Sequence, residues 1–427
     1  MTNVFDELKW RGLIFDHTEG IEALLGKEKI TVYNGFDPTA DSLHIGHLVP
    51  MMGLARMQRF GHTPIAVGGG GTGMIGDPSG KSKERNLLTL DQIQYNLDCV
   101  QKQMAPILDF EVKSNPAQIV NNYSWLSELS MMEFLRDTGK YFTINYMMAK
   151  DSVKSRLERE GEGISYTEFS YMLLQSYDFL HLFDTYGCVM QAGGSDQWGN
   201  ITAGIELIRR VRSTKVHGLA YPLITRDDGS KFGKTADGAS VWLDPNKTSP
   251  YRFYQFWLNT NDGDVINYLK YFTWLDQEVT AALAQEVADQ PHLRAAQRKL
   301  AQEMTGMVHG ATAVTKAEQA AKVLFGGELD GLDAADIQDI FADVPSSQIP
   351  KTDLEGEGLP VVDLLVSSAL ERSKGAARRA IQGGGIYLNN QRVTDVAQMA
   401  TLNQAVEGQF LVLRKGRKKY HLVQLLV

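Results

Sequence analysis

Two runs of this sequence carry side chains that suit the binding of phosphate groups. The run His44-Ile45-Gly46-His47 follows an apolar stretch at 29–35 that predicts a strand, and it opens a predicted helix over 46–60. Two imidazoles beside a helix N-terminus provide donors and a positive field, which suit an oligophosphate. Far downstream, Lys231-Phe232-Gly233-Lys234-Thr235 offers two ammonium groups and a hydroxyl, which suit a pyrophosphate leaving group. Either run alone is a weak signal, and the two together predict an oligophosphate site.

A glycine-rich segment between these runs admits several interpretations. Gly71-Thr72-Gly73-Met74-Ile75-Gly76 fits the Gly-x-Gly-x-x-Gly pattern of dinucleotide-binding folds, but Asp77-Pro78 follows at once and breaks the helix that the pattern needs. Gly80-Lys81-Ser82 resembles the end of a P-loop, although Ile75 stands where that motif needs glycine. The remaining interpretations are a flexible surface loop, or a loop whose glycines approach a ligand closely while cations close over phosphates. Those cations would be Lys81, Lys83 and Arg85.

A stripe of polar side chains lies on an otherwise apolar predicted helix. The capping box Ser165-x-x-Glu168 opens this helix, which runs to about Phe183. Tyr171, Gln175 and Asp178 are spaced i, i+4 and i+7, so they share one face. A helix that is apolar on its other faces is buried, and a buried carboxylate needs partners. The stripe therefore faces solvent, bonds another helix, or holds a small polar ligand, in which case Tyr33 is the natural facing residue.

The elements that would position these side chains alternate between strand and helix. A strand at 63–67 precedes a helix near 90–104, and a strand at 188–192 leads to Ser195, the predicted N-cap of a helix over 196–212. This order predicts an α/β fold in which a doubly wound parallel sheet is covered on both faces. Ligands of such sheets bind at the carboxyl ends of the strands, where segments 33–47, 68–85 and 191–200 begin.

Composition is that of an ordinary globular protein without export or membrane signals. The chain has 427 residues, of which 43% are hydrophobic and 22% are charged. Its two cysteines, Cys99 and Cys188, lack metal spacing and suit reduced thiols in a cytosolic chain. The N-terminal residues do not form a signal peptide, and no apolar run approaches the roughly 18 residues of a membrane span. We therefore expect a cytoplasmic protein of two to three domains.

Charge is distributed unevenly along the chain. The net charge is −8, which argues against nonspecific nucleic-acid binding by the whole chain. Residues 361–427 nevertheless hold ten Lys and Arg against four Asp and Glu, an excess of +6, so the rest carries −14. A basic module on an acidic enzyme suits a folded RNA backbone, although a basic surface without such a partner, or a module that only stabilises a dimer, stays open. The two basic clusters are Arg372, Lys374, Arg378 and Arg379, and Arg414, Lys415, Arg417, Lys418 and Lys419.

Taken together, these motifs resemble the bacterial tyrosyl-tRNA synthetase family among class I aminoacyl-tRNA synthetases. The resemblance covers essentially the whole chain, and the tail resembles a small RNA-binding domain shared with a ribosomal small-subunit protein. Lys-Phe-Gly-Lys-Thr stands here for the family's Lys-Met-Ser-Lys-Ser type of loop, with both lysines and the final hydroxyl kept. The motifs are Tyr33-x-Gly35-Phe36-Asp37-Pro38-Thr39, His44-Ile45-Gly46-His47, Gly76-Asp77-Pro78, Tyr171-x-x-x-Gln175-x-x-Asp178, Gly193-Gly194-Ser195-Asp196-Gln197 and Lys231-x-x-Lys234-Thr235.

The resemblance implies a role for each of these residues. Tyr33 and Asp178 would hydrogen-bond a substrate phenol. Its ammonium would be held by Asp77, Tyr171 and Gln175, with support from Asn122 and Gln191. The ATP site would be lined by Gly35, Asp37, Gly46, His47, Gly193, Asp196, Gln197 and Lys234. The phosphates would be gripped in the transition state by Thr39, His44, His47, Lys81, Arg85, Lys231 and Lys234.

The same resemblance implies a reaction, partners and a division into domains. L-tyrosine and Mg²⁺-ATP would give tyrosyl-adenylate and pyrophosphate, and tRNA(Tyr) would then take the tyrosyl group at its 3′ end. We expect a homodimer without a protein-bound structural metal and without membrane contact. A Rossmann-like catalytic domain with a dimer-forming insertion would span 1–225, the lysine loop and a connector 226–246, a helical anticodon-arm domain 247–325, a linker 326–357, and an α+β RNA-binding domain 358–427.

Three other functions remain as alternatives. A nucleotidylyltransferase would share His-x-Gly-His but has no use for the phenol pocket or the tail. A tryptophanyl enzyme would share the fold but not the pair Tyr33 and Asp178. A noncatalytic RNA-binding relative would keep the tail and lose the catalytic motifs, which are intact here.

Overall fold

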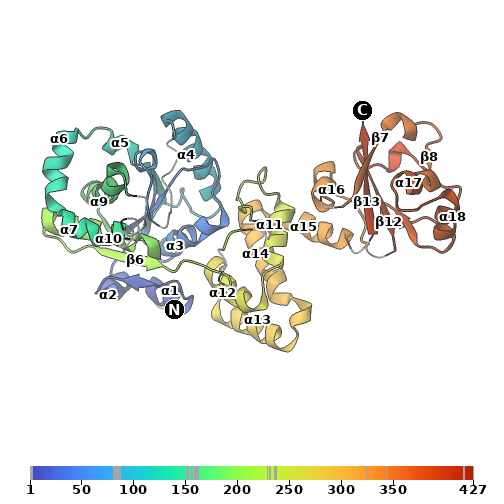
Figure 1. Ribbon diagram of the computed structural model, residues 1–427. Helices are drawn as coiled ribbons and strands as arrows, with labels where there is room; N and C mark the ends of the chain where they lie inside the picture. The colour runs from blue at the N-terminus through green and yellow to red at the C-terminus, as the bar shows by residue number, and fades with distance from the viewer. Residues whose placement is uncertain are drawn as a thin grey trace. The chain divides into compact units, whose positions relative to one another are not determined.

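A six-stranded sheet organises the first of two units of the chain (Figure 1). The computed structural model describes residues 3–79, 88–150, 153–154, 157, 163–227, 229, 232–234, 238–324, 326–342, 344–416 and 419–426. The first unit comprises 1–247 and 259–300, and the second comprises 248–258 and 301–427. Among the described residues, no helix has the length and apolar character that crossing a membrane requires.

The order of the strands confirms the doubly wound parallel sheet. The strands are β1 (Asp16–His17), β2 (Thr31–Phe36), β3 (Thr63–Gly68), β4 (Gln118–Asn121), β5 (Cys188–Gly194) and β6 (His217–Tyr221). They lie in the order β1-β6-β5-β2-β3-β4, and all neighbours are parallel except β1 and β6. The chain moves outward from β2 to β3 and β4 on one side, and from β5 to β6 on the other. The topological switch therefore falls between β2 and β5, where such sheets bind ligands.

Helices connect the parallel strands and cover the sheet. Helix α3 (Leu48–Arg59) joins β2 to β3, α4 (Leu90–Met104) follows β3, α9 (Tyr166–Tyr186) precedes β5, and α10 (Trp198–Arg212) joins β5 to β6. Because such crossovers are right-handed and these two run in opposite directions along the sheet, α3 and α10 cover opposite faces. Helices α9 and α10 pack side by side, as Figure 1 shows.

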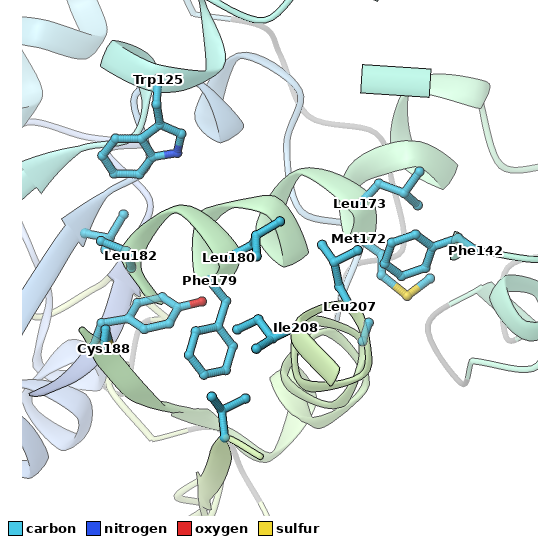
Figure 2. Packing of buried hydrophobic residues seen from close by; sticks show 14 of the residues in the cluster. Trp125, Phe142, Met172, Leu173, Phe179, Leu180, Leu182, Cys188, Leu207 and Ile208 are labelled. Atoms are coloured by element: carbon cyan, nitrogen blue, oxygen red, sulfur yellow. The ribbon is translucent and has the colours of Figure 1, made fainter. Parts of the chain in front are cut away.

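Helix α9 is buried on most sides, as its sequence predicted. The Ser165 hydroxyl caps its first turn by accepting a hydrogen bond from the amide of Glu168, and Gly187 ends it in the left-handed region at φ 62°. Figure 2 shows Phe179 and Leu180 of α9 packed among side chains from α10 and β5. Other labelled members of this core are Trp125, Phe142, Met172, Leu173, Leu182, Cys188, Leu207 and Ile208.

The entry into α10 differs from the sequence prediction. Ser195 is not the N-cap, because Ser195–Gln197 forms a 3₁₀ turn and α10 begins at Trp198 with Gln197 as its N-cap. Strand β5 continues to Gly194, so the chain must turn sharply before the helix starts, and short 3₁₀ turns are frequent at helix N-termini.

The remaining elements of the first unit include α1 (Val4–Trp10), α2 (Ile21–Lys27), α12 (Asp262–Phe272) and α13 (Gln277–Asp289). Short helices α5 (Tyr123–Leu126), α6 (Met131–Glu133) and α7 (Ile144–Met148) lie between β4 and α9 in the chain. Helix α14 (Ala295–His309) contains the division between the two units.

A second sheet, of order β10-β9-β12-β13-β7, organises the second unit, with β9 at Ile386–Leu388 and β10 at Gln391–Arg392. Strands β12 (Phe410–Lys415) and β13 (Lys419–Leu426) form its antiparallel centre. Leu411 and Leu413 pack into a cluster with α17 (Val361–Ser367) and α18 (Lys374–Gln382). The intervening Val412 packs instead with residues of α15 (Ala311–Val323) and α16 (Ala334–Ile340). The sheet is thus covered on both faces, which follows from the period-two alternation of a strand.

The segment predicted to be a linker, 326–357, contributes a strand to this sheet. It contains α16 and strand β7 (Ser346–Pro350), which pairs in parallel with β13. Its acidic residues are partly structural, since Asp333 caps α16 through a capping box. Ile337 and Phe341 are buried against the sheet. Composition suggested a linker because the caps and turns of a folded segment use the same residue types as a flexible one.

Candidate active site

A cavity of about 600 Å³ opens at the carboxyl ends of β2 and β5, at the topological switch. Tyr33 of β2 and Gln191 of β5 are paired in register, and both line the cavity. The structure brings sixteen residues predicted for the site to this one cavity. They are Tyr33, Gly35, Asp37, Thr39, His44, Gly46, His47, Asp77, Asn122, Tyr171, Gln175, Asp178, Gln191, Gly193, Asp196 and Gln197.

Two buried polar atoms of the cavity lining lack hydrogen-bond partners among the described residues. The hydroxyl of Tyr33 and Oε1 of Gln191 have no hydrogen-bond partner among the described residues, although both side chains are 2% exposed. Burial and the nearby Asp178 carboxyl raise the pKa of Tyr33, which is therefore a neutral donor at physiological pH. Buried polar atoms without partners are costly, so these two atoms indicate a polar ligand.

Two donors hold the Asp178 carboxylate. Trp125 Nε1 donates to Oδ1 at 2.7 Å, and Asn122 Nδ2 donates to Oδ2 at 2.9 Å. Burial raises the pKa of Asp178 to about 7, while these two hydrogen bonds act in the opposite direction. The Trp125 ring in turn stacks on His181 at 4.4 Å. Trp125 was not predicted from the sequence, because nothing in its local spacing relates it to α9.

A second group of hydrogen-bonded side chains at the cavity consists of amides and the Asp77 carboxylate. Gln197 Nε2 donates to Asp77 Oδ2 at 2.7 Å, and Asn200 Nδ2 donates to Gln175 Oε1 at 3.0 Å. Gln175 Nε2 donates to Gln197 Oε1 at 3.3 Å and so joins the two halves. Burial, followed by the carboxylates of Asp37, Asp77 and Asp178, raises the pKa of Tyr171. Asn200, like Trp125, was missed by the sequence analysis. The arrangement concentrates negative charge where a cationic group would be favoured.

The two histidines cap the helical turn that they open. His44 Nδ1 accepts the amide hydrogen of Gly46 at 3.1 Å, and His47 Nδ1 accepts that of His44 at 3.1 Å. Because both Nδ1 atoms accept, the proton of each neutral ring is assigned to Nε2. Their rings lie 4.0 Å apart and both line the cavity. The two imidazoles therefore lie beside the start of α3, in the arrangement that the sequence predicted, and both line the cavity.

The lysine loop is joined to the histidine segment through the backbone. His44 forms an antiparallel bridge with Trp242, and the amide of Val241 donates to the Gly233 carbonyl at 3.2 Å. Phe232 lines the cavity, whereas Lys234 is not among the lining residues and donates from Nζ to Ser240 Oγ at 2.7 Å. The predicted residues Lys81, Arg85 and Lys231 lie outside the described residues, as does Thr235.

The basic clusters of the second unit divide into exposed and structural members. Arg372, Lys374, Arg378, Arg379 and Lys419 are exposed. Arg414 is only 7% exposed, lies 3.7 Å over the ring of Tyr387 and donates to Asn390 Oδ1 at 2.8 Å, so we correct its predicted role from RNA contact to packing. Lys374 and Lys415 form ion pairs of 2.7 Å with Asp363 and Glu371. The predicted Arg417 and Lys418 lie outside the described residues.

This cavity suits positioning and charge stabilisation. Within the described residues, no group of three or more His, Cys, Asp or Glu side chains could hold a metal ion. The lining combines buried polar side chains, several carboxylates and two imidazoles. Such a set of side chains can hold an amino acid and a phosphate ester with their reacting atoms together.

Comparison with known proteins identifies the chain in two stages. Residues 25–326 match the family of class I tRNA synthetases specific for tryptophan and tyrosine (W and Y), and residues 336–423 match the C-terminal domain of tyrosine–tRNA ligases. The chain belongs to the class I tRNA synthetases. The tyrosine–tRNA ligase of Roseiflexus castenholzii is 58% identical over 100% of both chains, and that of Geobacillus stearothermophilus is 52% identical over 98% of both. Within the class, therefore, the chain belongs to the bacterial tyrosine–tRNA ligases.

Solved structures agree with this assignment. A C-terminally truncated mitochondrial tyrosyl-tRNA synthetase of Aspergillus nidulans has a TM-score of 0.69 and 30% identity, over 76% of this chain and 95% of that one. A tryptophanyl-tRNA synthetase of Encephalitozoon cuniculi has a TM-score of 0.52 at 15% identity, over 73% of this chain and 87% of that one. The second likeness concerns the fold alone, so the preference for tyrosine rests on the full-length relatives.

Proposed function

We propose that the buried part of the cavity, where Tyr33 and Asp178 lie, binds the phenol of L-tyrosine through these two side chains. The observation that carries this proposal is the buried Tyr33 hydroxyl, which has no partner among the described residues although Asp178 lies nearby. A phenol hydroxyl can accept a hydrogen bond from Tyr33 and donate one to the Asp178 carboxylate. The substrate ammonium then meets Asp77, Tyr171 and Gln175, and Asn122 and Gln191 support the pocket.

In this proposal, ATP occupies the part of the cavity between the carboxyl end of β5 and the turn that precedes α3. Gly193, Asp196 and Gln197 approach its ribose and adenine on one side, while Gly35, Asp37, Gly46 and His47 line the other. Thr39 and the Nε2 donors of His44 and His47 suit the phosphates. Lys81, Arg85, Lys231 and Lys234 would close over the phosphates from the two loops that carry them.

The reaction needs no side-chain nucleophile. A carboxylate oxygen of tyrosine forms a bond to the α-phosphorus of ATP, and the bond from that phosphorus to the β-bridging oxygen breaks. Tyrosyl-adenylate forms and pyrophosphate leaves with the electron pair. The terminal ribose hydroxyl of tRNA(Tyr) then attacks the tyrosyl carbonyl and releases AMP. The imidazole and ammonium donors would stabilise charge that develops on the phosphates in the first step.

Further parts of the proposal concern the rest of the assembly. Mg²⁺ enters as part of the substrate, bound to the ATP phosphates. Residues 247–325 would serve as the anticodon-arm domain, and the exposed cations of 358–427 would contact tRNA. We place the protein in the cytoplasm. Homodimerisation is supported by exposed apolar side chains in the segment between β4 and α9. Those side chains are Met131, Met132, Ile144 and Met148, together with Tyr166 at the first position of α9.

Amino-acid-dependent exchange between ATP and pyrophosphate tests the proposal. Wild type should exchange rapidly with tyrosine and far more slowly with phenylalanine or tryptophan. Tyr33→Phe should narrow the preference for tyrosine over phenylalanine by about tenfold or more, because it removes one donor to the phenol. Exchange that tryptophan supports as well as tyrosine would refute the assigned specificity. An unchanged preference in both Tyr33→Phe and Asp178→Asn would remove these residues from the phenol site.

A further inference from the structure

Two buried arginines hold the C-terminal end of α12. Arg11 follows α1 and is 2% exposed, and Arg56 lies on α3 and is 1% exposed. Arg11 Nη1 donates to the carbonyls of Lys270 at 2.7 Å and Thr273 at 3.1 Å, and Arg56 Nη2 donates to the same carbonyls at 3.3 and 3.0 Å. Arg11 Nη2 also reaches the carbonyl of Leu275 at 2.9 Å. Two guanidinium groups therefore share the last carbonyls of one helix.

The charge of Arg56 is buried in an unusual setting. Arg11 has a carboxylate partner, Glu7, at 2.5 Å, whereas Nε and Nη1 of Arg56 lack hydrogen-bond partners among the described residues. Burial lowers the pKa of Arg56 to about 9, so the group stays cationic near neutral pH. The partial negative charge of a helix C-terminus stabilises a cation, but an apolar side chain would fill this space without the cost of desolvation. Such local costs are often found where a residue serves function.

The lysine loop rests on the same helix. The ring of Phe232 stacks on Phe272, the last residue of α12, with centroids 5.3 Å apart and an interplanar angle of 14°. It also meets Tyr268 edge-on at 5.1 Å. In the first turn of α12, Gly263 leaves room for Asp227, whose Oδ2 would lie 2.6 Å from a β-carbon at that position. Asp227 and Phe232, two described residues of the segment that carries the lysines, thus contact the two ends of α12.

These contacts form a continuous path to the cavity. Arg56 lies on α3, which begins directly after His47, and it fixes the end of α12 on which Phe232 stacks. Phe232 lines the cavity and is followed by Gly233, whose carbonyl is bonded to the strand-like segment that pairs with His44. A shift of the α12 terminus would move the loop relative to the two histidines.

We propose that Arg11 and Arg56 are positioning residues for the lysine loop, acting through the C-terminal end of α12. The inference rests on the proposed adenylate-forming function. Neither arginine lines the cavity. Both hold the end of α12 on which Phe232 stacks, and they thereby determine where Phe232, Gly233 and Lys234 lie relative to the phosphates. Because the proposed function places the two lysines of this loop at the phosphates, loss of this positioning affects the activation step and leaves the tyrosine pocket unchanged.

The test compares Arg56→Lys and Arg56→Met with wild type in the full chain. Stopped-flow adenylate formation should slow by between about tenfold and 10²-fold, the range that a displaced positioning element can cause. Tyrosine affinity, measured by equilibrium binding, should stay within about twofold. Arg209→Ala is the control, because Arg209 is an exposed arginine on α10 that pairs with Glu206 at 2.7 Å, and its loss should leave the rate unchanged. If Arg56→Met does not fold, Arg56→Lys and Arg11→Lys carry the same test.

A double-mutant cycle separates positioning from general stability. Arg56→Lys and Phe232→Leu should be non-additive in the rate of adenylate formation, since both act on one contact chain. Additive effects, or parallel losses of tyrosine affinity and rate, would overturn the inference. If the wild type showed no tyrosine-dependent exchange, the proposed function would be refuted. If the wild type were active and both Arg56→Lys and Arg56→Met formed adenylate at the wild-type rate, this inference alone would be refuted.

Discussion

The indole of Trp125 donates a 2.7 Å hydrogen bond to Oδ1 of Asp178, a residue 53 positions away. The carboxylate is thereby oriented from one side by Trp125 on α5 and from the other by Asn122. The orientation of the proposed phenol acceptor depends on a residue that need not touch the substrate.

Trp125→Phe should weaken tyrosine binding. The variant keeps an aromatic ring against His181 but removes a hydrogen bond to a charged group, which is worth about 1.5–3 kcal/mol. We expect the dissociation constant for tyrosine to rise by roughly 10- to 100-fold, as measured by equilibrium dialysis or fluorescence titration. Trp10→Phe, on α1 and away from the cavity lining, is the control and should bind tyrosine as wild type does. Unchanged binding in Trp125→Phe would show that the indole does not orient Asp178.

Asp178 should make the stability of the ligand-free protein depend on pH. Burial raises the pKa of its carboxyl from 3.8 to about 7, so between these values the unfolded chain has lost this proton while the folded chain keeps it. The free energy of unfolding of wild type, relative to Asp178→Asn, should therefore fall as pH rises from about 4 to about 7 and level off above. Urea unfolding of both proteins across this range measures the difference. A difference that rises with pH would mean that the carboxyl is ionised in the folded state.

His44→Ala should slow the formation of tyrosyl-adenylate. Removal of one pre-positioned donor to developing charge typically costs on the order of 10²–10³ in rate. Stopped-flow measurement of the first step, with tyrosine affinity determined separately, should show a lower rate at unchanged affinity. A loss of tyrosine affinity at an unchanged rate would assign His44 to the amino-acid site instead.

The exposed cations of α18 should act on tRNA and leave activation unchanged. In Arg378→Ala with Arg379→Ala, we expect weaker tRNA binding and a salt dependence reduced by about one for each lost phosphate contact. Tyrosine-dependent pyrophosphate exchange should match wild type. Charging kinetics at two ionic strengths make the comparison, and unimpaired charging would remove both arginines from the interface.

Arg414→Met supplies a contrast to that pair. Because Arg414 is buried over Tyr387 and bonded to Asn390, its loss should lower the free energy of unfolding of the second unit by about 1.5–3 kcal/mol. Thermal and urea unfolding of the full chain should detect this loss, with exchange activity kept. Full stability with impaired tRNA binding would return Arg414 to the set of direct RNA contacts.

The parts that could be predicted from sequence were those with local periodicity. The alternation of strands with helices predicted the sheet. The i, i+4, i+7 stripe on α9 left three arrangements open, and the structure has the one in which Tyr171, Gln175 and Asp178 line one cavity with Tyr33. The residues whose roles the sequence analysis missed or misassigned depend on contacts between distant segments. Trp125 and Asn200 join the site only because the sheet brings separate connections together. The sequence analysis placed Arg414 on the surface because it lies in a short run of charged residues. Such a run does not reveal that the strand which carries Arg414 belongs to a sheet covered on both faces.

The sheet order also dictates when this binding crevice can come into being during synthesis. Strand β2 lies beside β5, yet the chain makes β3, β4 and all the intervening helices before β5 is available. A growing polypeptide can pair β2 with β3 early, but the wall that holds Gln191 is missing until a further stretch of chain has left the ribosome. Loop closure over such a separation is slow, and apolar surfaces of β2 stay accessible in the meantime. The nascent chain thus passes through a stage in which β2 and β3 have been made but β5 has not, so the cavity is incomplete. During this stage, binding of tyrosine or ATP cannot stabilise the chain.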